Sequence, residues 1–208
     1  CPRGKMIGGC SSHNGMVFVR GNRNDYERWE NFGLKSWSYN KILPYFKKIE
    51  KWSGGENQYR GSFGLLPVNQ SKNDNPLFSS FLEAASEAGH KINPDMNGEY
   101  QEGFGMFDTT IHKGERASVA KYYLNPIKSR KNLNIFSNSF VEKIIFEGKK
   151  AIGIEVKIKN KVEKIYANKE IILSGGSINS PQLLMLSGIG DANHLKEKGI
   201  NVVNDVKG

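Results

Sequence analysis

The stretch "GGCSSHNGMVFVRGN", from Gly8 to Asn22, places small residues directly before an apolar run. Two adjacent glycines precede short hydroxyl side chains and the Asn14-Gly15 pair, so the backbone carries little steric bulk. Such a segment can lie against the pyrophosphate or the ring face of a cofactor. It can equally be a glycine-rich turn that enters a strand without a ligand. The residue types alone leave both interpretations open.

A second glycine-rich stretch, "IILSGGSINSP", has the pattern of a strand, a turn and a helix. The apolar run Ile171 to Leu173 predicts a strand buried on both faces, and Ser180 with Pro181 predicts a helix start. Ligands bind where such strands end and helices begin. A turn that needs glycine for its dihedral angles is the alternative, because no GxGxxG or GxxxxGK[ST] motif is present.

Residues for acid–base or metal chemistry are poorly represented. The four histidines have no partner at a recognisable spacing, and they are His13, His90, His112 and His194. No GxSxG or HExxH motif occurs, and Cys1 and Cys10 form no CxxC pair. We therefore expect no catalytic residue and no metal ligand in this chain.

Composition bounds the class of protein. The 208 residues are 38% hydrophobic and include eleven Phe, which is typical of a globular chain and not of a disordered one. The net charge of +9 could indicate nucleic acid, but lysines alternate with Glu and apolar residues between Val141 and Glu170. We expect a solvated basic surface with no nucleic-acid partner. No apolar run approaches the roughly 20 residues of a transmembrane helix.

The patterns predict helices in the first two thirds of the chain. One begins at Ser38, with Ile42, Phe46 and Ile49 on one face and Pro44 inside. A second is capped by Asn75 and ends at Gly89. Its expected apolar stripe is Leu77, Phe81, Ala84, Ala85 and Ala88. A third is expected from Arg116 to Arg130, with Pro126 near its end.

From Leu133 the apolar residues recur at every second position, which is typical of strands. "AIGIEVKIKN" alternates strictly, with Ile152, Ile154 and Val156 on one face. Gly148-Lys149 and Asn160-Lys161 supply turns, so a small antiparallel meander is expected. Both ends of the chain look cut, and we expect it to be a fragment.

Two stretches together resemble a known family. "PRGKMIGGCSSHNGMVFVRGN" and "GGSINSPQLLMLSGIG" are similar to the first and second signatures of the glucose–methanol–choline (GMC) oxidoreductases. The material between them also resembles the family, so the likeness covers essentially the whole chain. Within the family, the sequence is most similar in kind to the insect glucose-dehydrogenase-like members. The resemblance implies FAD as the cofactor. By analogy with secreted insect members, it also implies a secreted or extracellular protein.

The resemblance implies an α/β fold. It would be a partial FAD-binding Rossmann-like domain with a β-meander, plus part of a substrate-binding domain. Residues 1–35 would belong to the FAD-binding domain and residues 36–115 to the substrate-binding domain or lid. Residues 116–190 would return to the FAD-binding domain, with the meander and the second signature. Residues 191–208 would begin the next substrate-domain segment.

The resemblance also places cofactor contacts. Asn14-Gly15 would lie near the flavin ring, Val141 at the adenine end, and Ser174 and Gly175 near the adenosine part. The full expected set is Met6, Gly8, Gly9, Asn14, Gly15, Met16, Val17, Val141, Ser174 and Gly175. Cys10 stands where the family usually has Ser. His13 stands where an apolar residue is common, and it is not assigned as a covalent flavin attachment point.

The implied activity is oxidation of a CH–OH group in an alcohol or a sugar, with hydride passing from the carbinol carbon to flavin N5. The electron acceptor stays open. The family's GxGxxG motif lies upstream of the first signature and its active-site His lies downstream of the second, so this piece alone is expected to be inactive. The alternative is a non-catalytic, basic interaction protein that retains a degenerate form of the fold.

Overall fold

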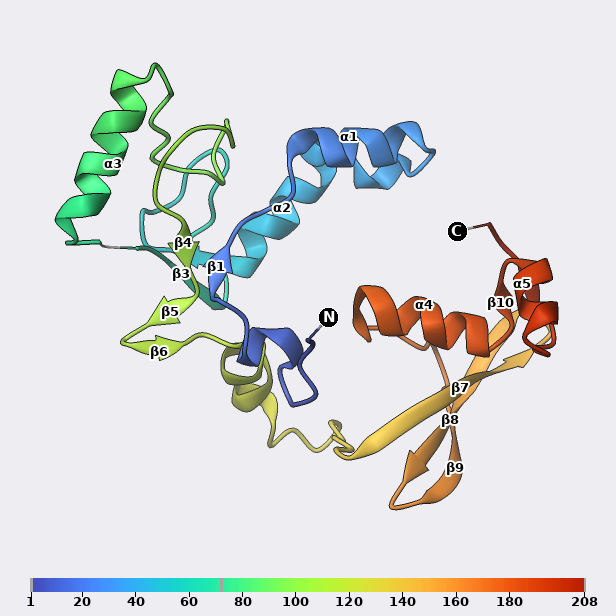
Figure 1. Ribbon diagram of the computed structural model, residues 1–208. Helices are drawn as coiled ribbons and strands as arrows, with labels where there is room; N and C mark the ends of the chain where they lie inside the picture. Colours follow the sequence, from blue (N-terminus) through green and yellow to red (C-terminus); the bar gives the residue numbers. More distant parts are fainter. Residues whose placement is uncertain (1, 72, 208) are drawn as a thin grey trace. The chain divides into compact units, whose positions relative to one another are not determined.

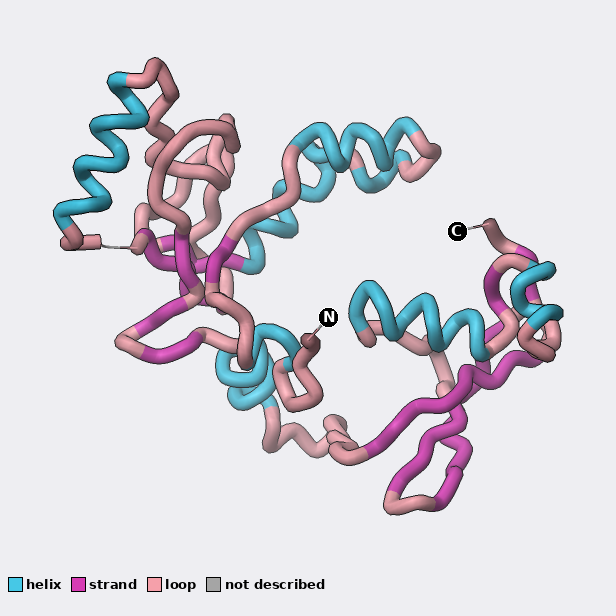
Figure 2. Tube along the Cα trace, viewed as in Figure 1, coloured by secondary structure: helices cyan, strands magenta, loops and turns pink. Residues whose placement is uncertain are grey.

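The chain divides into two units, Cys1–Leu133 and Asn134–Gly208, in a computed structural model that describes residues 2–71 and 73–207 (Figure 1). Both units contain helices and strands (Figure 2). The expected α/β class is confirmed. The division into four domain segments stays a prediction.

The first unit contains a small mixed sheet. Its strand order is β1-β4-β3-β2, with β2 and β3 parallel and the other neighbours antiparallel. The strands are β1 (Val17–Phe18), β2 (Glu50–Trp52), β3 (Leu66–Gln70) and β4 (Asp108–Thr109). A hairpin of β5 (Ile111–His112) and β6 (Glu115–Arg116) follows directly. The sheet thus joins the first signature, through Val17 and Phe18, to Asp108 and Thr109 much later in the chain.

Two helices of the first unit pack against each other. Helix α1 (Arg23–Asn31) starts at a capping box, in which the Asn22 side chain accepts from the backbone and Asp25 reaches back to Asn22 N. Helix α2 (Tyr39–Ile49) follows Ser38 and contains Pro44, as predicted. The 3₁₀ turn η2 (Lys35–Trp37) connects them. Tyr26, Tyr39 and Ile42 form the buried cluster between the two helices.

Two helix predictions are partly wrong. Helix α3 (Pro76–Glu87) has the predicted Asn75 cap, but of its expected stripe only Ala85 is buried, and Leu77 is 75% exposed. The helix expected from Arg116 is shorter and irregular. It consists of the π-helical turn η3 (Ala120–Leu124) and the 3₁₀ turn η4 (Asn125–Ile127). Arg116 instead pairs with Ile111 in the hairpin, which removes it from the helix.

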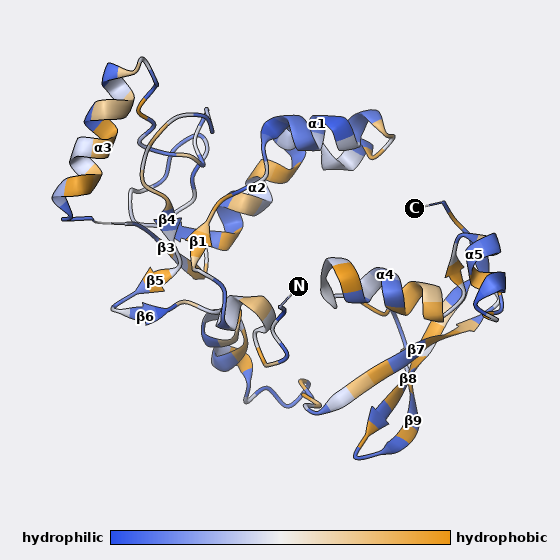
Figure 3. Cartoon of the chain, viewed as in Figure 1, coloured by the Kyte–Doolittle hydropathy of each residue, from blue (hydrophilic) through white to orange (hydrophobic). Residues whose placement is uncertain are grey.

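The second unit confirms the predicted meander. Strands β7 (Ser139–Glu147), β8 (Lys150–Ile158) and β9 (Lys161–Tyr166) are antiparallel neighbours. Apolar and polar residues alternate along β8 (Figure 3), and Val156 on β8 and Ile144 on β7 are buried. Helix α4 (Gly176–Leu186), strand β10 (Ile189–Gly190), helix α5 (Ala192–Glu197) and strand β11 (Asn204–Asp205) complete the unit.

The start of α4 differs from the prediction. The helix begins at Gly176, and Pro181 lies inside it. Ser180 is therefore not the cap residue, although its Oγ accepts a hydrogen bond from Gly175 N at 3.0 Å. The strand predicted at Ile171 to Leu173, buried on both faces, is wrong, because among the described residues this run pairs with no strand and Ile172 is 77% exposed. Apolar continuity alone does not identify a strand, because a strand also needs a neighbour.

Candidate functional site

The loop before β1 carries the first group of predicted cofactor residues. Gly8 and Gly9 have φ values of 91° and 53°, and Gly9 opens the 3₁₀ turn η1 (Gly9–Ser12). A Cβ atom at Gly8 would lie 2.3 Å from Ser12 Oγ, so the fold of the loop itself requires glycine there. The Ser11 hydroxyl donates to Gly8 O at 2.5 Å, which closes the turn.

Gly15 is different, because the described chain gives no reason for glycine at this position. Its φ lies outside the left-handed region, and a Cβ atom there would meet nothing within 4 Å. The backbone at Gly15 therefore faces open space that a flat group could occupy. This part of the loop fits the flat ring of FAD, because no atom of the chain occupies the space beside the backbone of Gly15.

The neighbours of Gly15 are also accessible. Met6 and Val17 are 55% and 51% exposed, so both side chains are open to a ligand. Met16 has a φ of 62°, a left-handed conformation that costs energy for a residue with a side chain. Thr110 N donates to Met16 O at 2.8 Å and keeps the backbone in this conformation.

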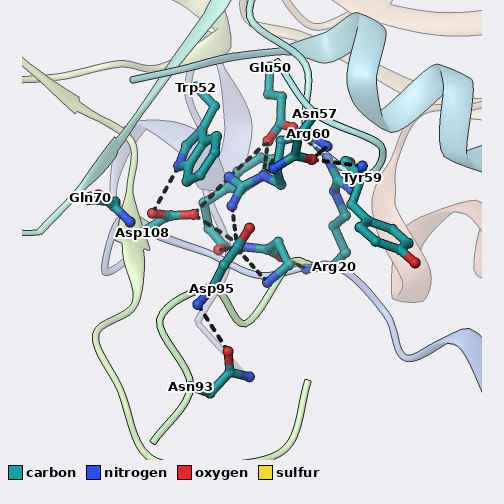
Figure 4. A network of polar contacts seen from close by, with 12 residues as sticks. Arg20, Glu50, Trp52, Asn57, Tyr59, Arg60, Gln70, Asn93, Asp95 and Asp108 are labelled. Atoms are coloured by element: carbon teal, nitrogen blue, oxygen red, sulfur yellow. Dashed lines mark hydrogen bonds and ion pairs between the residues drawn. The ribbon is translucent and has the colours of Figure 1, made fainter. Parts of the chain in front are cut away.

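A buried network of charges lies where β1 ends (Figure 4). Arg20 Nη2 lies 2.5 Å from Glu50 Oε1, and Arg60 Nη2 lies 3.1 Å from Glu50 Oε2. Arg60 also binds Asp95 at 2.5 Å and Asp108 at 2.7 Å. The guanidinium groups of Arg20 and Arg60 thus form ion pairs with three carboxylates. Each charge has a partner of opposite sign, which offsets the cost of removing it from water.

The environment shifts the two guanidinium groups in opposite directions. Loss of hydration lowers the pKa of Arg20, in spite of the attraction of Glu50. Burial also lowers the pKa of Arg60, but the bonds and charges of Glu50 and Asp108 outweigh it and raise the pKa above the usual value. Arg60 is therefore the more firmly charged of the two arginines.

This network fixes the exit of the first-signature loop. Asn97 Nδ2 donates to Phe18 O at 2.9 Å, and Arg20 N donates to Asn97 Oδ1 at 2.8 Å. Phe18 also pairs with Asp108 in the sheet. The strand that follows the proposed flavin-facing loop is thus held by main-chain bonds to the charged cluster.

The second group of predicted residues lies in the other unit. Val141 on β7, and Ser174 and Gly175 before α4, line one cavity of about 420 Å³. The remaining lining residues are Ser139, Phe140, Ile154, Ile171, Ile172, Leu173, Asn179, Ser180, Gln182, Leu183 and Leu186. The cavity is mainly apolar with a few polar groups at its edge, which fits the adenine end of FAD. Three of the predicted cofactor residues therefore line one cavity, and their contact with FAD stays a prediction.

Sequence reasoning missed Arg116. Its guanidinium Nη1 donates to Asn14 O at 2.7 Å, across 102 residues of sequence. The pattern around Arg116 resembles a helix start, and no local signal points to a contact with the first signature.

The four histidines, all of which the structure describes, form neither a buried base nor a metal site. None of the four histidines is buried. In the parts that the structure describes, no group of three or more His, Cys, Asp or Glu side chains could hold a metal ion.

Comparisons with known proteins all point to one family. The family profile described as "GMC oxidoreductase" matches residues 1–205. An oxygen-dependent choline dehydrogenase of Brucella anthropi is 49% identical over 207 residues, which are 100% of this chain and 38% of the relative. A human protein named "Choline dehydrogenase, mitochondrial" is 50% identical over 100% of this chain and 35% of its own length. The chain therefore spans little more than a third of these relatives.

A solved structure has the same fold. It is an FAD-dependent oxidoreductase from Chaetomium thermophilum, with a TM-score of 0.90 and 31% identity over 98% of this chain and 38% of that one. The expectation of FAD as the cofactor is confirmed.

The expectation of a secreted or extracellular protein is wrong, because the similar choline dehydrogenases are bacterial and mitochondrial proteins. No helix among the described residues has the length and apolarity to cross a membrane.

Proposed function

The chain belongs to the GMC oxidoreductase family, and from this premise we propose that it forms part of an FAD-dependent enzyme that oxidises an alcohol. The bare backbone at Gly15, in a loop whose other glycines are explained by the fold, carries the proposal. When bound, FAD supplies the acceptor for the hydride that the carbinol carbon of the substrate loses. The residues of this chain bind and orient that cofactor.

Each unit, taken by itself, contains residues proposed to contact the cofactor. Asn14, Gly15 and Met16 would lie along the flavin ring, with Met6, Gly8, Gly9 and Val17 around it. Val141, Ser174 and Gly175 would enclose the adenine end, in the cavity of the second unit. The proton acceptor for the alcohol would come from outside these residues, because the resemblance places the active-site His of the family downstream of the second signature.

Choline or a similar small alcohol is the proposed substrate. Support comes from two choline dehydrogenases that are 49% and 50% identical over the whole chain. Oxidation of a sugar, as in the insect glucose-dehydrogenase-like members that the sequence resembles, is the alternative. A non-catalytic protein that keeps the fold without the cofactor is the rival from a different class.

The test uses the full-length protein that the gene encodes, purified with FAD present. We expect the flavin absorption bands in the purified protein, and bleaching of those bands when choline is added without oxygen. Bleaching by glucose and not by choline would favour the sugar alternative. A protein that retains no flavin would overturn the proposal and favour the non-catalytic interpretation. Bleaching reports the transfer to the cofactor directly, whichever electron acceptor the enzyme uses.

A further inference from the structure

Arg116 contacts the first-signature loop from the β5–β6 hairpin. Its Nη1 atom lies 2.7 Å from Asn14 O, 2.8 Å from Asn14 Oδ1 and 3.4 Å from Ser11 O. All three acceptors belong to the loop that would face the flavin. In the part of the chain that the structure describes, Arg116 has no carboxylate partner. Its side chain is therefore engaged by the loop and not by an ion pair.

These contacts fix which way the Asn14 side chain faces. The oxygen and nitrogen of an Asn amide are told apart only by their partners. Here the same amide atom meets Arg116 Nη1 at 2.8 Å and Met16 N at 3.1 Å. Arginine and a backbone N–H can only donate, so that atom must be the oxygen. The amide nitrogen, Nδ2, necessarily points the other way.

The amide nitrogen of Asn14 is left as a spare donor. Among the described residues, nothing accepts a hydrogen bond from Asn14 Nδ2, and the residue is exposed. It stands next to Gly15, where the backbone faces open space. The left-handed conformation of Met16 is held from both sides, since Met16 N donates to Asn14 Oδ1 and Met16 O accepts from Thr110 N. The donor is thus held in one orientation by its surroundings.

We propose that Arg116 is a positioning residue that locks the Asn14 amide, so that Asn14 Nδ2 donates a hydrogen bond to an acceptor atom of the flavin ring. This inference rests on the proposed function, because it assumes that FAD lies against this loop. Without Arg116 the bond from Met16 N at 3.1 Å alone holds the amide oxygen, so the amide can turn its oxygen towards the acceptors of the ring more often. A donor at this place stabilises the more negative, reduced flavin, and so it raises the reduction potential.

Four variants of the full-length, FAD-loaded protein separate the donor from its support. Asn14→Asp keeps an oxygen for Arg116 and for Met16 N but replaces the spare donor by an acceptor. Arg116→Met removes the shorter of the two bonds to Asn14 Oδ1 and leaves the one from Met16 N. Arg130→Met is the matched control, because Arg130 is exposed and loses the same charge without a side-chain contact in the described structure. Arg116→Lys tests whether charge without the planar fork is sufficient.

The readouts are the reduction potential of the bound flavin and the unfolding midpoint of the protein. We expect Asn14→Asp and Arg116→Met each to weaken the preference for reduced over oxidised flavin about tenfold or more, which is about 30 mV for a two-electron couple. The midpoint of Asn14→Asp should stay unchanged. Arg116→Lys should recover part of the loss, and Arg130→Met should match the wild type.

Equal potentials in the wild type and in Asn14→Asp would overturn the inference while leaving the proposed function intact. The same would follow if Arg130→Met lowered the potential as much as Arg116→Met, since only charge would then matter. If Arg116→Met fails to fold, Asn14→Asp still decides the question. A wild-type protein that binds no FAD overturns the proposed function and this inference together.

Discussion

The carboxylate of Glu50 meets the guanidinium of Arg60, and neither side chain is exposed to solvent. Arg60 Nη2 lies 3.1 Å from Glu50 Oε2, while Glu50 Oε1 accepts from Gly61 N at 2.7 Å. The Trp52 ring lies 4.2 Å from the Arg60 guanidinium carbon and covers it. Charges taken out of water depend on such partners, so this pair should control the stability of the first unit.

Arg60→Met should lower the free energy of unfolding of the full-length protein by about 3–5 kcal/mol. Glu50, Asp95 and Asp108 would lose their ion pairs with Arg60, and only the pair of Glu50 with Arg20 would remain. Urea unfolding followed by tryptophan fluorescence measures this, with Trp52 as a local probe. Arg23→Met is the control, since its pair with Glu27 is exposed, and its midpoint should equal that of the wild type. An unchanged midpoint for Arg60→Met would contradict the prediction.

Ser187 joins α4 to the meander. It is 1% exposed, accepts from Ile144 N at 2.8 Å and donates to Leu183 O at 2.6 Å. Ser187→Ala should cost about 1–3 kcal/mol, because Ile144 N would be buried without a partner. Ser177→Ala, on the exposed start of α4, is the control in the same denaturation experiment and should have no effect. Equal midpoints for the two variants would show that water replaces the hydroxyl.

Gly15→Ala tests whether a ligand lies against the loop. The chain has space for the added methyl group and no backbone strain to oppose it, so the unfolding midpoint without FAD should not change. If the flavin occupies that space, the FAD dissociation constant should rise about tenfold or more. Titration of the apoprotein with FAD measures this. A wild-type affinity would place the flavin elsewhere.

Val141→Trp should weaken FAD binding by filling the cavity of about 420 Å³ that Val141 lines. The amount of flavin retained after gel filtration is the measurement. Val162→Trp makes the same substitution on β9 of the same meander, where the side chain is 57% exposed and outside the cavity. The control should retain wild-type flavin. Equal losses in both variants would point to damage to the meander and not to the cavity.

Tyr123 should make stability depend on alkaline pH. Burial raises the pKa of its phenol, whose hydroxyl donates to Ile49 O at 3.3 Å. The unfolded chain therefore loses this proton first, near pH 10, and the contribution to stability is full below that pH. It declines as the pH rises towards and through the folded pKa. Unfolding midpoints measured from pH 8 to above about 10 should fall less steeply for Tyr123→Phe, and parallel curves would contradict this.

Local features were accessible from the sequence because neighbouring residues decide them. The Asn75 cap, the turn at Gly148 and the alternation along β8 depend on a few consecutive residues each, and the structure has all three. The helix expected from Arg116 failed for the opposite reason. Its first residue, Arg116, pairs with Ile111, and a hairpin contact outweighs a weak helical pattern.

The sequence by itself determined the family, through two signatures at the ends of the chain, and with the family the cofactor. Only the tertiary structure showed that Glu50 and Arg60 share a buried network, and that Arg116 fixes the Asn14 amide from 102 residues away. Such contacts leave no local pattern, because they depend on where the sheet brings distant segments. A hydrogen bond or ion pair is stronger where burial removes competing water, and burial is a property of the folded chain.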